Sequence, residues 1–191
     1  MASWRSIVSA LALAVCAGCS HPPPETGLWV SPFALTDQTG ADFKSDTLLG
    51  HVWIANFMFT NCPGPCPRMS SQMHDVQTAL AGQDVKLVSM TVDPDRDTPE
   101  KLAKYAAFYS ATPGVWYFLT GPRETLDHLG SGVFKLNHVD GSFDHSLRFV
   151  LVDRKSQIRG YYQTTEPDAI QRVIADARLL LKEAASGDRR P

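Results

Sequence analysis

The feature that most constrains the fold of this chain is a nearly continuous apolar run, VWIANFMF, at residues 52–59. Half-exposed strands alternate apolar and polar residues, whereas this run contains a single polar residue, Asn56. A short run of this kind is typical of a strand that is buried on both faces of a sheet. We therefore expect a central strand here, with the rest of the domain built around it.

The patterns on either side of this run alternate between strand and helix. The predicted elements are a hairpin at 33–43, strands at 52–59, 85–92 and 115–120, helices from Pro67, from Thr98 and over 123–130, a second hairpin at 147–153 and 158–162, and a last helix. Thr165 and Asp168 match a capping box that would open the last helix. This order predicts an α/β chain with a thioredoxin-like fold and an added N-terminal β-hairpin.

The N-terminal residues indicate export. Arg5 precedes an apolar run at 7–15 that is too short to span a bilayer but typical of a secretory signal. The residues AGC at 17–19 are similar to the end of a lipoprotein cleavage site, which would make Cys19 the lipidated first residue. Cys16 departs from such sites, which usually carry Leu at that position. Plain secretion and an uncleaved anchor are the alternatives.

This pattern predicts four segments and a location. The segments are a lipoprotein-type signal peptide at 1–18, a Pro-rich tether at 19–30, one thioredoxin-like domain at 31–185 and a flexible C-terminal tail at 186–191. We expect the mature protein on the extracytoplasmic, periplasmic side of a bacterial cell envelope. A lipid anchor would hold it to the membrane.

The charge of the chain argues against a nucleic-acid partner. Arg5 is one of 18 basic residues, and its removal with the signal leaves 17 against 20 acidic residues, a formal net charge of −3. Proteins that bind nucleic acid carry basic patches, and this sequence has no polybasic run. The sequence therefore predicts no binding to nucleic acid.

Two cysteines, Cys62 and Cys66, remain once Cys16 and Cys19 are assigned to the signal region. They lie in FTNCPGPCPR, on the loop between the central strand and the helix that Pro67 opens. A disulfide that closes so short a loop restricts the unfolded chain little, so a purely structural bridge is disfavoured. The pair is expected to exchange disulfides or to bind a metal, with thiol pKa values lowered by the helix N-terminus.

His145 is the residue that could complete a metal site. It lies shortly before a predicted core strand, where a thioredoxin-like fold presents a cis-proline to its dithiol, and no proline occurs between Pro122 and Pro167. A lone histidine is more often a surface residue. Two thiolates and one imidazole suit Cu(I) and can also hold Cu(II), while zinc with a water ligand fits as well. Asp144 is either a positioning group or a turn residue.

Three segments together resemble one protein family. They are FTNCPGPCP at 59–67, TVDPDRDTPE at 91–100 and FDHS at 143–146. Over residues 33–181 the chain is similar to the Sco/SenC family, thioredoxin-like copper-binding proteins that serve cytochrome c oxidase assembly. The combination is specific, whereas a pair of cysteines at this spacing alone would not be.

This resemblance implies a ligand set and a function. Cys62, Cys66 and His145 would bind copper, as Cu(I), Cu(II) or both. The protein would be a metallochaperone that delivers copper to the binuclear copper centre of cytochrome c oxidase, or prepares the cysteines of that centre. Its partners would be the copper-bearing oxidase subunit or another copper chaperone. Gly64 departs from the family, which often has an acidic residue there, and this leaves the thiol potential and the copper affinity open.

A second interpretation is a thiol–disulfide oxidoreductase in which Cys62 and Cys66 are a redox-active pair without metal. The carrier and the exchanger share this pair, so whether the protein is an enzyme stays open. A peroxidase of the peroxiredoxin type is disfavoured, because Thr60 lies two positions before Cys62 and the Thr-x-x-Cys pattern is absent.

Other residues with ligand chemistry have structural interpretations. Met69 and Met73 fall on the apolar stripe of the predicted helix and are expected to pack in the core. His138 is expected on a solvated loop from which it could approach the site. The segment DPDRD at 93–97 reads as a turn and helix start, with docking of a partner as the alternative.

Overall fold

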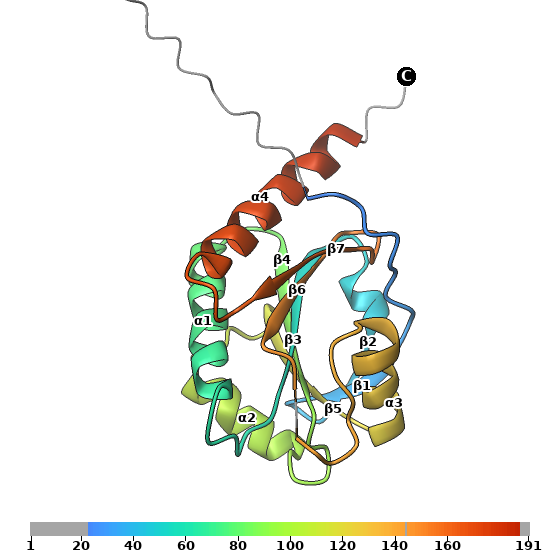
Figure 1. Ribbon diagram of the computed structural model, residues 1–191, viewed down its shortest axis with the longest axis vertical. Helices are drawn as coiled ribbons and strands as arrows, with labels where there is room; N and C mark the ends of the chain where they lie inside the picture. Colours follow the sequence, from blue (N-terminus) through green and yellow to red (C-terminus); the bar gives the residue numbers. More distant parts are fainter. Residues whose placement is uncertain (1–22, 144, 188–191) are drawn as a thin grey trace, which may run out of the picture.

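The computed structural model describes residues 23–143 and 145–187. Within them, seven strands form one sheet in the order β2-β1-β5-β4-β3-β6-β7 (Figure 1). The strands are β1 (Ala34–Asp37), β2 (Asp42–Lys44), β3 (Val52–Met58), β4 (Val85–Thr91), β5 (Trp116–Thr120), β6 (Arg148–Val152) and β7 (Ile158–Gln163). Strand β3 pairs in parallel with β4 and antiparallel with β6. The predicted interior position of this strand is confirmed.

Helices cover both faces of the sheet. The helical elements are η1 (Ser45–Leu48), α1 (Cys66–Ala79), α2 (Pro99–Phe108), α3 (Arg123–Asp127), the π-helical η2 (His128–Val133) and α4 (Ala169–Gly187). Helices α1, α2 and α4 lie on one side of the sheet and α3 on the other (Figure 1). The α/β class, the predicted order of elements and the added hairpin of β1 and β2 are confirmed.

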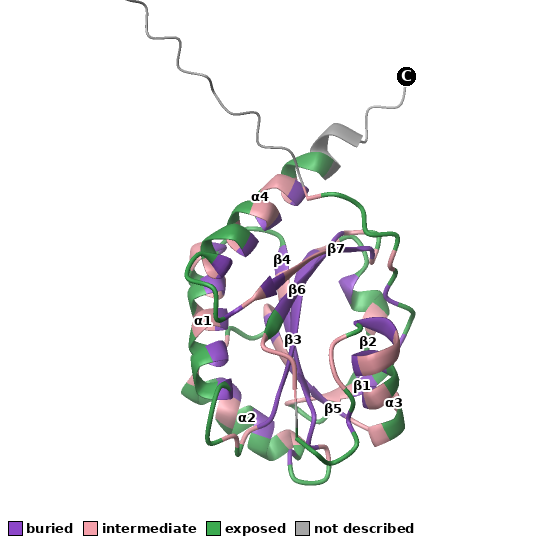
Figure 2. Ribbon diagram, in the orientation of Figure 1, coloured by how far each residue is buried: buried purple, intermediate pink, exposed green. Residues whose placement is uncertain are grey.

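The core lies on both faces of β3, whose residues are all buried (Figure 2). On one face, the rings of Trp53 and Phe57 meet the ring of Phe134 edge-on, at centroid distances of 6.0 and 5.9 Å. On the other, Met69 and Met73 of α1 are buried, so their predicted packing role is confirmed. The apolar run is continuous because water reaches neither face of this strand.

Two helix boundaries differ from the predictions. The third helix, expected to end at Gly130, continues as η2 to Val133. The last helix begins at Ala169, so Thr165 does not cap it and the predicted capping box is wrong. The reason is local, because Pro167 disfavours the helical conformation for the residue that precedes it.

The described N-terminal segment lies against the hairpin of β6 and β7. The amide of Val30 donates to the carbonyl of Ser156 at 2.8 Å, and the buried Arg159 side chain donates to the carbonyl of Pro23 at 3.1 Å. The chain enters the described part at the end of the molecule opposite the start of α1 (Figure 1). The expected signal peptide, Cys19 and the last four residues lie outside the described residues.

In the part of the chain that the structure describes, none of the helices combines the length and apolar character needed to cross a bilayer.

A buried carboxylate joins the loops at one end of the sheet. Asp97, in the turn before α2, is fully buried. Its oxygens accept hydrogen bonds from the Thr60 amide at 3.1 Å, from the Thr60 hydroxyl at 2.5 Å and from the Thr91 hydroxyl at 2.5 Å. Thr60 lies just after β3 and Thr91 ends β4. Asp97 therefore fixes the chain that leads into the cysteine loop.

We predict that Asp97→Ala destabilises the protein strongly, because it leaves the Thr60 amide and the hydroxyls of Thr60 and the buried Thr91 without their acceptor. An unsatisfied buried donor costs about 1–3 kcal/mol, so a loss of about 3 kcal/mol or more is expected in the free energy of unfolding. Urea-induced unfolding followed by circular dichroism measures it.

The matched control is Asp95→Ala in the same turn, where the side chain is 76% exposed and pairs with Arg123. An exposed ion pair contributes about 0–1 kcal/mol, so this variant should stay close to the wild type. Equal losses in the two variants would contradict the role given to Asp97.

Candidate metal centre

Three side chains singled out by the sequence meet at the end of the sheet where β3 ends. Cys62 lies in the loop after β3, Cys66 is the first residue of α1, and His145 precedes β6. Because β6 runs antiparallel to β3, the start of β6 lies beside the end of β3. The topology thus brings a histidine from a distant part of the sequence to the cysteine loop.

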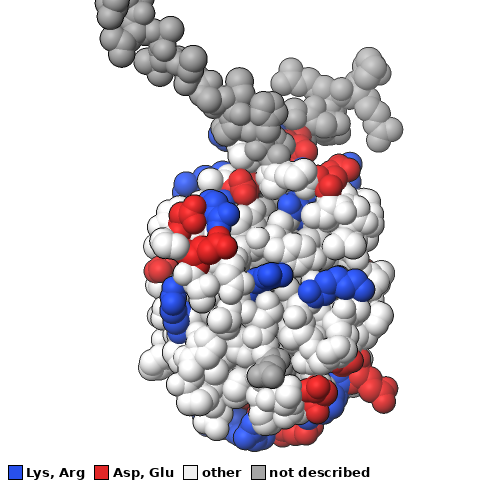
Figure 3. Space-filling view, in the orientation of Figure 1, with Lys and Arg blue, Asp and Glu red and all other residues white. Residues whose placement is uncertain are grey.

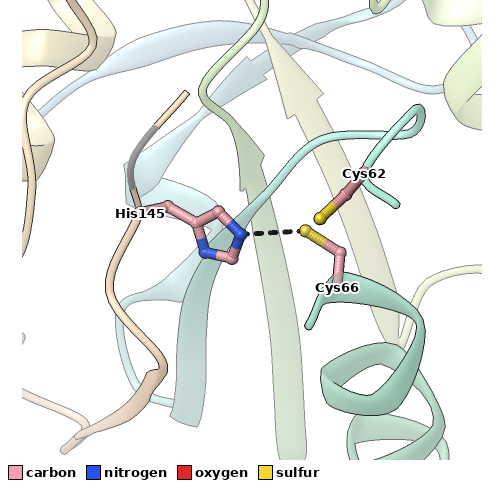
Figure 4. Close-up of side chains that lie close together, drawn as sticks. All are labelled: Cys62, Cys66 and His145. Carbon is pink, nitrogen blue, oxygen red and sulfur yellow. Dashed lines mark hydrogen bonds between the residues drawn. The ribbon is translucent and has the colours of Figure 1, made fainter. Parts of the chain in front are cut away.

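The three side chains are close enough to share one ion. The sulfur atoms of Cys62 and Cys66 and a ring nitrogen of His145 all lie within 4.8 Å of one another. The Nε2 atom of His145 is 2.9 Å from Sγ of Cys66, and the imidazole points toward both sulfur atoms (Figure 4). Both cysteines are free thiols. The geometry agrees with the predicted ligand set, while metal binding by these residues stays a prediction.

A hydrogen bond on the far side of the His145 ring orients the imidazole. Nδ1 lies 3.2 Å from the carbonyl oxygen of Ser146. A carbonyl oxygen only accepts, so Nδ1 is the donor in this bond, and in the neutral imidazole Nε2 then carries the lone pair. That lone pair faces the sulfur of Cys66. A neutral imidazole oriented in this way is the form that binds a metal ion.

The expectation of a lowered thiol pKa is wrong for Cys66. Burial raises the pKa of the Cys66 thiol, and a hydrogen bond from the backbone of Phe59 opposes the rise only in part. The neighbouring Cys62 and the carboxylate of Asp97 add to it. Although Cys66 begins α1, its side chain is fully buried, so desolvation outweighs the favourable helix dipole. A metal ion would therefore have to displace a proton from this sulfur.

The two cysteines differ in their access to solvent. Cys66 is buried, whereas Cys62 is half-buried and lies at the start of the exposed residues 63–65. A Cβ atom at Gly64 would meet no other atom within 4 Å, so the backbone there leaves room for a side chain. The position is not packed against other residues, so the glycine does not leave a cavity.

The other candidate ligands are not part of this group. His138 is largely exposed, and its Nδ1 lies 3.1 Å from a carboxylate oxygen of Asp127. It lines an open cavity of about 530 Å³ together with His145, but the cluster found among the described residues does not include it. Asp144 lies outside the described residues, so its proposed positioning role stays untested.

The segment at 93–97 does more than form a turn. Asp93 is also buried, and its carboxylate accepts a hydrogen bond from Arg96. Sequence reasoning missed both buried carboxylates. A turn-forming Asp and a buried Asp look alike in the sequence, because the donors that satisfy Asp97 come from the ends of two separate strands.

Comparison with known proteins identifies the family. The model of the SCO1/SenC family matches residues 22–181. A SCO1 protein homolog of Bacillus subtilis is 33% identical over 156 residues, which cover 78% of this chain and 81% of the relative. A protein of Stutzerimonas stutzeri, whose name refers to copper binding, is 32% identical over 150 residues, covering 73% of this chain and 72% of the relative.

Solved structures agree with the sequence comparison. A SCO1/SenC family lipoprotein from Bacillus anthracis superposes with a TM-score of 0.75 at 29% identity, over 82% of this chain and 96% of the other. BsSco, described as having a disulfide switch and as a member of the Sco family of cytochrome c oxidase assembly proteins, gives 0.73 at 30% identity, over 85% and 98%. These similarities confirm the thioredoxin-like fold, and the chain belongs to the SCO1/SenC family.

Proposed function

We propose that this protein carries copper and either delivers it to the binuclear copper centre of cytochrome c oxidase or prepares the cysteines of that centre. One observation carries the proposal: two free thiols and an oriented imidazole nitrogen lie within 4.8 Å of one another. Thiolates are soft ligands and imidazole is intermediate, a combination that favours copper over oxygen-seeking cations. Relatives described for copper binding and for oxidase assembly support this choice.

In this proposal each ligand has a distinct role. Cys62 and Cys66 supply the thiolates that hold Cu(I), and Nε2 of His145 adds the third donor that Cu(II) needs. Cys66, fully buried, anchors the ion. Cys62, half-buried at the edge of the loop, is the ligand that an incoming cysteine of a partner can replace first. Copper would then leave by ligand exchange through the Cys62 side.

The partner in this proposal is the copper-bearing subunit of the oxidase or another copper chaperone. Acidic and basic side chains are interspersed on the face shown in Figure 3, so this face does not select a strongly charged partner. We place the protein in the bacterial envelope, held by a lipid at Cys19. The N-terminal sequence and the lipoprotein among the structural neighbours support that location.

Thiol–disulfide exchange is the second candidate function. It is favoured by the proximity of the two free thiols and by the disulfide switch described for BsSco. The accessible Cys62 would attack a client disulfide, and Cys66 would resolve the mixed disulfide. Both functions use the cysteine pair, but copper transfer alone also uses His145.

We predict that Cys62→Ser and Cys66→Ser each remove tight copper binding, because one thiolate and one imidazole are too few soft donors. Loss of an outer hydrogen-bond partner alone costs about 10–100-fold in metal affinity, so loss of a ligand should cost at least about a hundredfold. Competition with a colorimetric Cu(I) chelator measures the change.

His138→Ala is the matched control for the cysteine variants, since His138 lies nearby but outside the cluster. It should bind copper as the wild type does. Excess Zn(II) should not displace Cu(II), given the order of affinities for divalent metals. Full affinity in either cysteine variant would show that the ligands are misassigned.

We predict that His145→Ala weakens Cu(II) binding at least about tenfold more than Cu(I) binding, because two thiolates can hold Cu(I) without the imidazole. Disulfide formation should survive. The sulfur-to-copper absorption bands of the Cu(II) complex and competition titrations in both oxidation states measure the effect, again with His138→Ala as control.

The same His145→Ala variant separates the two functions in cells grown with scarce copper. Normal oxidase activity there would contradict copper delivery. An oxidase defect that added copper partly restores would contradict simple disulfide exchange, since the exchanger does not need this histidine.

A further inference from the structure

Phe143 has an unusual environment two residues before His145. Its ring contacts both the ring of Phe59 and the guanidinium group of Arg96. The two rings are 5.5 Å apart at an interplanar angle of 33°, and Cζ of Arg96 lies 4.5 Å from the centroid of the Phe143 ring. Although it is a large apolar side chain, Phe143 is still 36% exposed. The ring is thus held by two specific contacts rather than by general burial.

The backbone conformation of Phe143 is also unusual for an aromatic residue. Its φ angle is +61°, in the left-handed region that aromatic residues rarely adopt. Such a conformation persists only where surrounding contacts enforce it, and in folded proteins it concentrates at functional sites. The ring contacts with Phe59 and Arg96 accompany this backbone conformation.

Both partners of the Phe143 ring are fixed to the body of the domain. Nε of Arg96 donates to the carboxylate of Asp93, which is buried in the turn after β4. Phe59 is 7% exposed and directly follows β3. A cation above an aromatic ring and an offset aromatic pair are both attractive contacts, and neither partner has to be ordered to make them.

The Phe59 ring touches both Phe143 and the candidate ligand. The His145 imidazole meets it edge-on, with ring centroids 5.9 Å apart and an interplanar angle of 85°. Phe59 also lies three residues before Cys62, where the chain enters the cysteine loop. Two side chains of the segment before β6 therefore rest on one aromatic ring that belongs to the cysteine side of the site.

We propose that Phe143 is a positioning residue for the metal centre: through its contacts with Arg96 and Phe59, it holds His145 with Nε2 directed at the cysteine sulfur atoms. The proposal rests on the proposed function, since it gives Phe143 the role of keeping His145, the third copper ligand, in place. Its specific consequence is that Phe143 governs the preference between Cu(II) and Cu(I) without contacting the ion.

The first test uses the metal-free protein, so that it does not depend on copper binding. The ring protons of His145 are observed by NMR in isotope-labelled wild type, Phe143→Ala, Phe143→Leu and Phe143→Tyr. Aromatic rings shift the resonances of protons near them. We expect the His145 resonances to move toward those of a solvated histidine in Phe143→Ala, to move partly in Phe143→Leu and to stay in place in Phe143→Tyr.

The second test measures Cu(II) and Cu(I) affinities of the same variants. Phe143→Ala should weaken Cu(II) by about tenfold or more, as expected for a residue that orients a ligand, and change Cu(I) by less than about twofold. Arg96→Gln should weaken Cu(II) less, and the double variant should lose less than the two separate losses together, because both residues act through one contact. Phe143→Tyr should retain the wild-type preference.

Phe108→Ala is the matched control, since Phe108 is another exposed aromatic side chain, 79% exposed at the end of α2, and should change neither measurement. Unmoved His145 resonances in Phe143→Ala would overturn the proposal, as would an equal weakening of Cu(I) and Cu(II). If the wild type bound no copper through its thiols, the proposed function would fail, while the metal-free NMR comparison would still decide whether Phe143 positions His145.

Discussion

The site depends on how the chain leaves the buried end of β3. The last residues of that strand are packed on both faces, so the direction in which the chain leaves the strand is fixed. The carboxylate of Asp97 then holds Thr60 from the side, through both its amide and its hydroxyl. A single residue, Asn61, separates this anchor from Cys62. These hydrogen bonds therefore fix the start of the loop that carries Cys62.

The two cysteine ligands differ in how far they are buried. The buried Cys66 has a thiol pKa raised by burial, so it releases its proton only to a strong competitor such as a soft metal ion. Cys62 is half-buried beside the exposed residues 63–65. In the proposed copper carrier, the buried Cys66 retains the ion, and the half-buried Cys62 is the ligand that a partner's cysteine replaces. The imidazole of His145 approaches from a separate segment of the chain and contacts the Cys66 sulfur through Nε2.

Local sequence patterns predicted the parts of the fold that local forces determine. The strand β3 could be predicted because burial on both faces requires a continuous apolar run. The start of α2 could be predicted because Thr98 and Pro99 are residue types that helix N-termini favour. The raised thiol pKa of Cys66 was missed, because helix position is local whereas desolvation depends on the packed domain. The contact between Phe59 and Phe143 was also missed, since no pattern in one sequence relates residues so far apart.

The central claim is that one copper ion binds Cys62, Cys66 and His145 together. X-ray absorption spectroscopy of the Cu(II)-loaded protein tests it most directly, because the scattering identifies the atoms bound to the metal. The account predicts two sulfur neighbours and a nitrogen neighbour with the multiple scattering of an imidazole ring. A copper shell of nitrogen and oxygen alone, or one with a single sulfur, would contradict it.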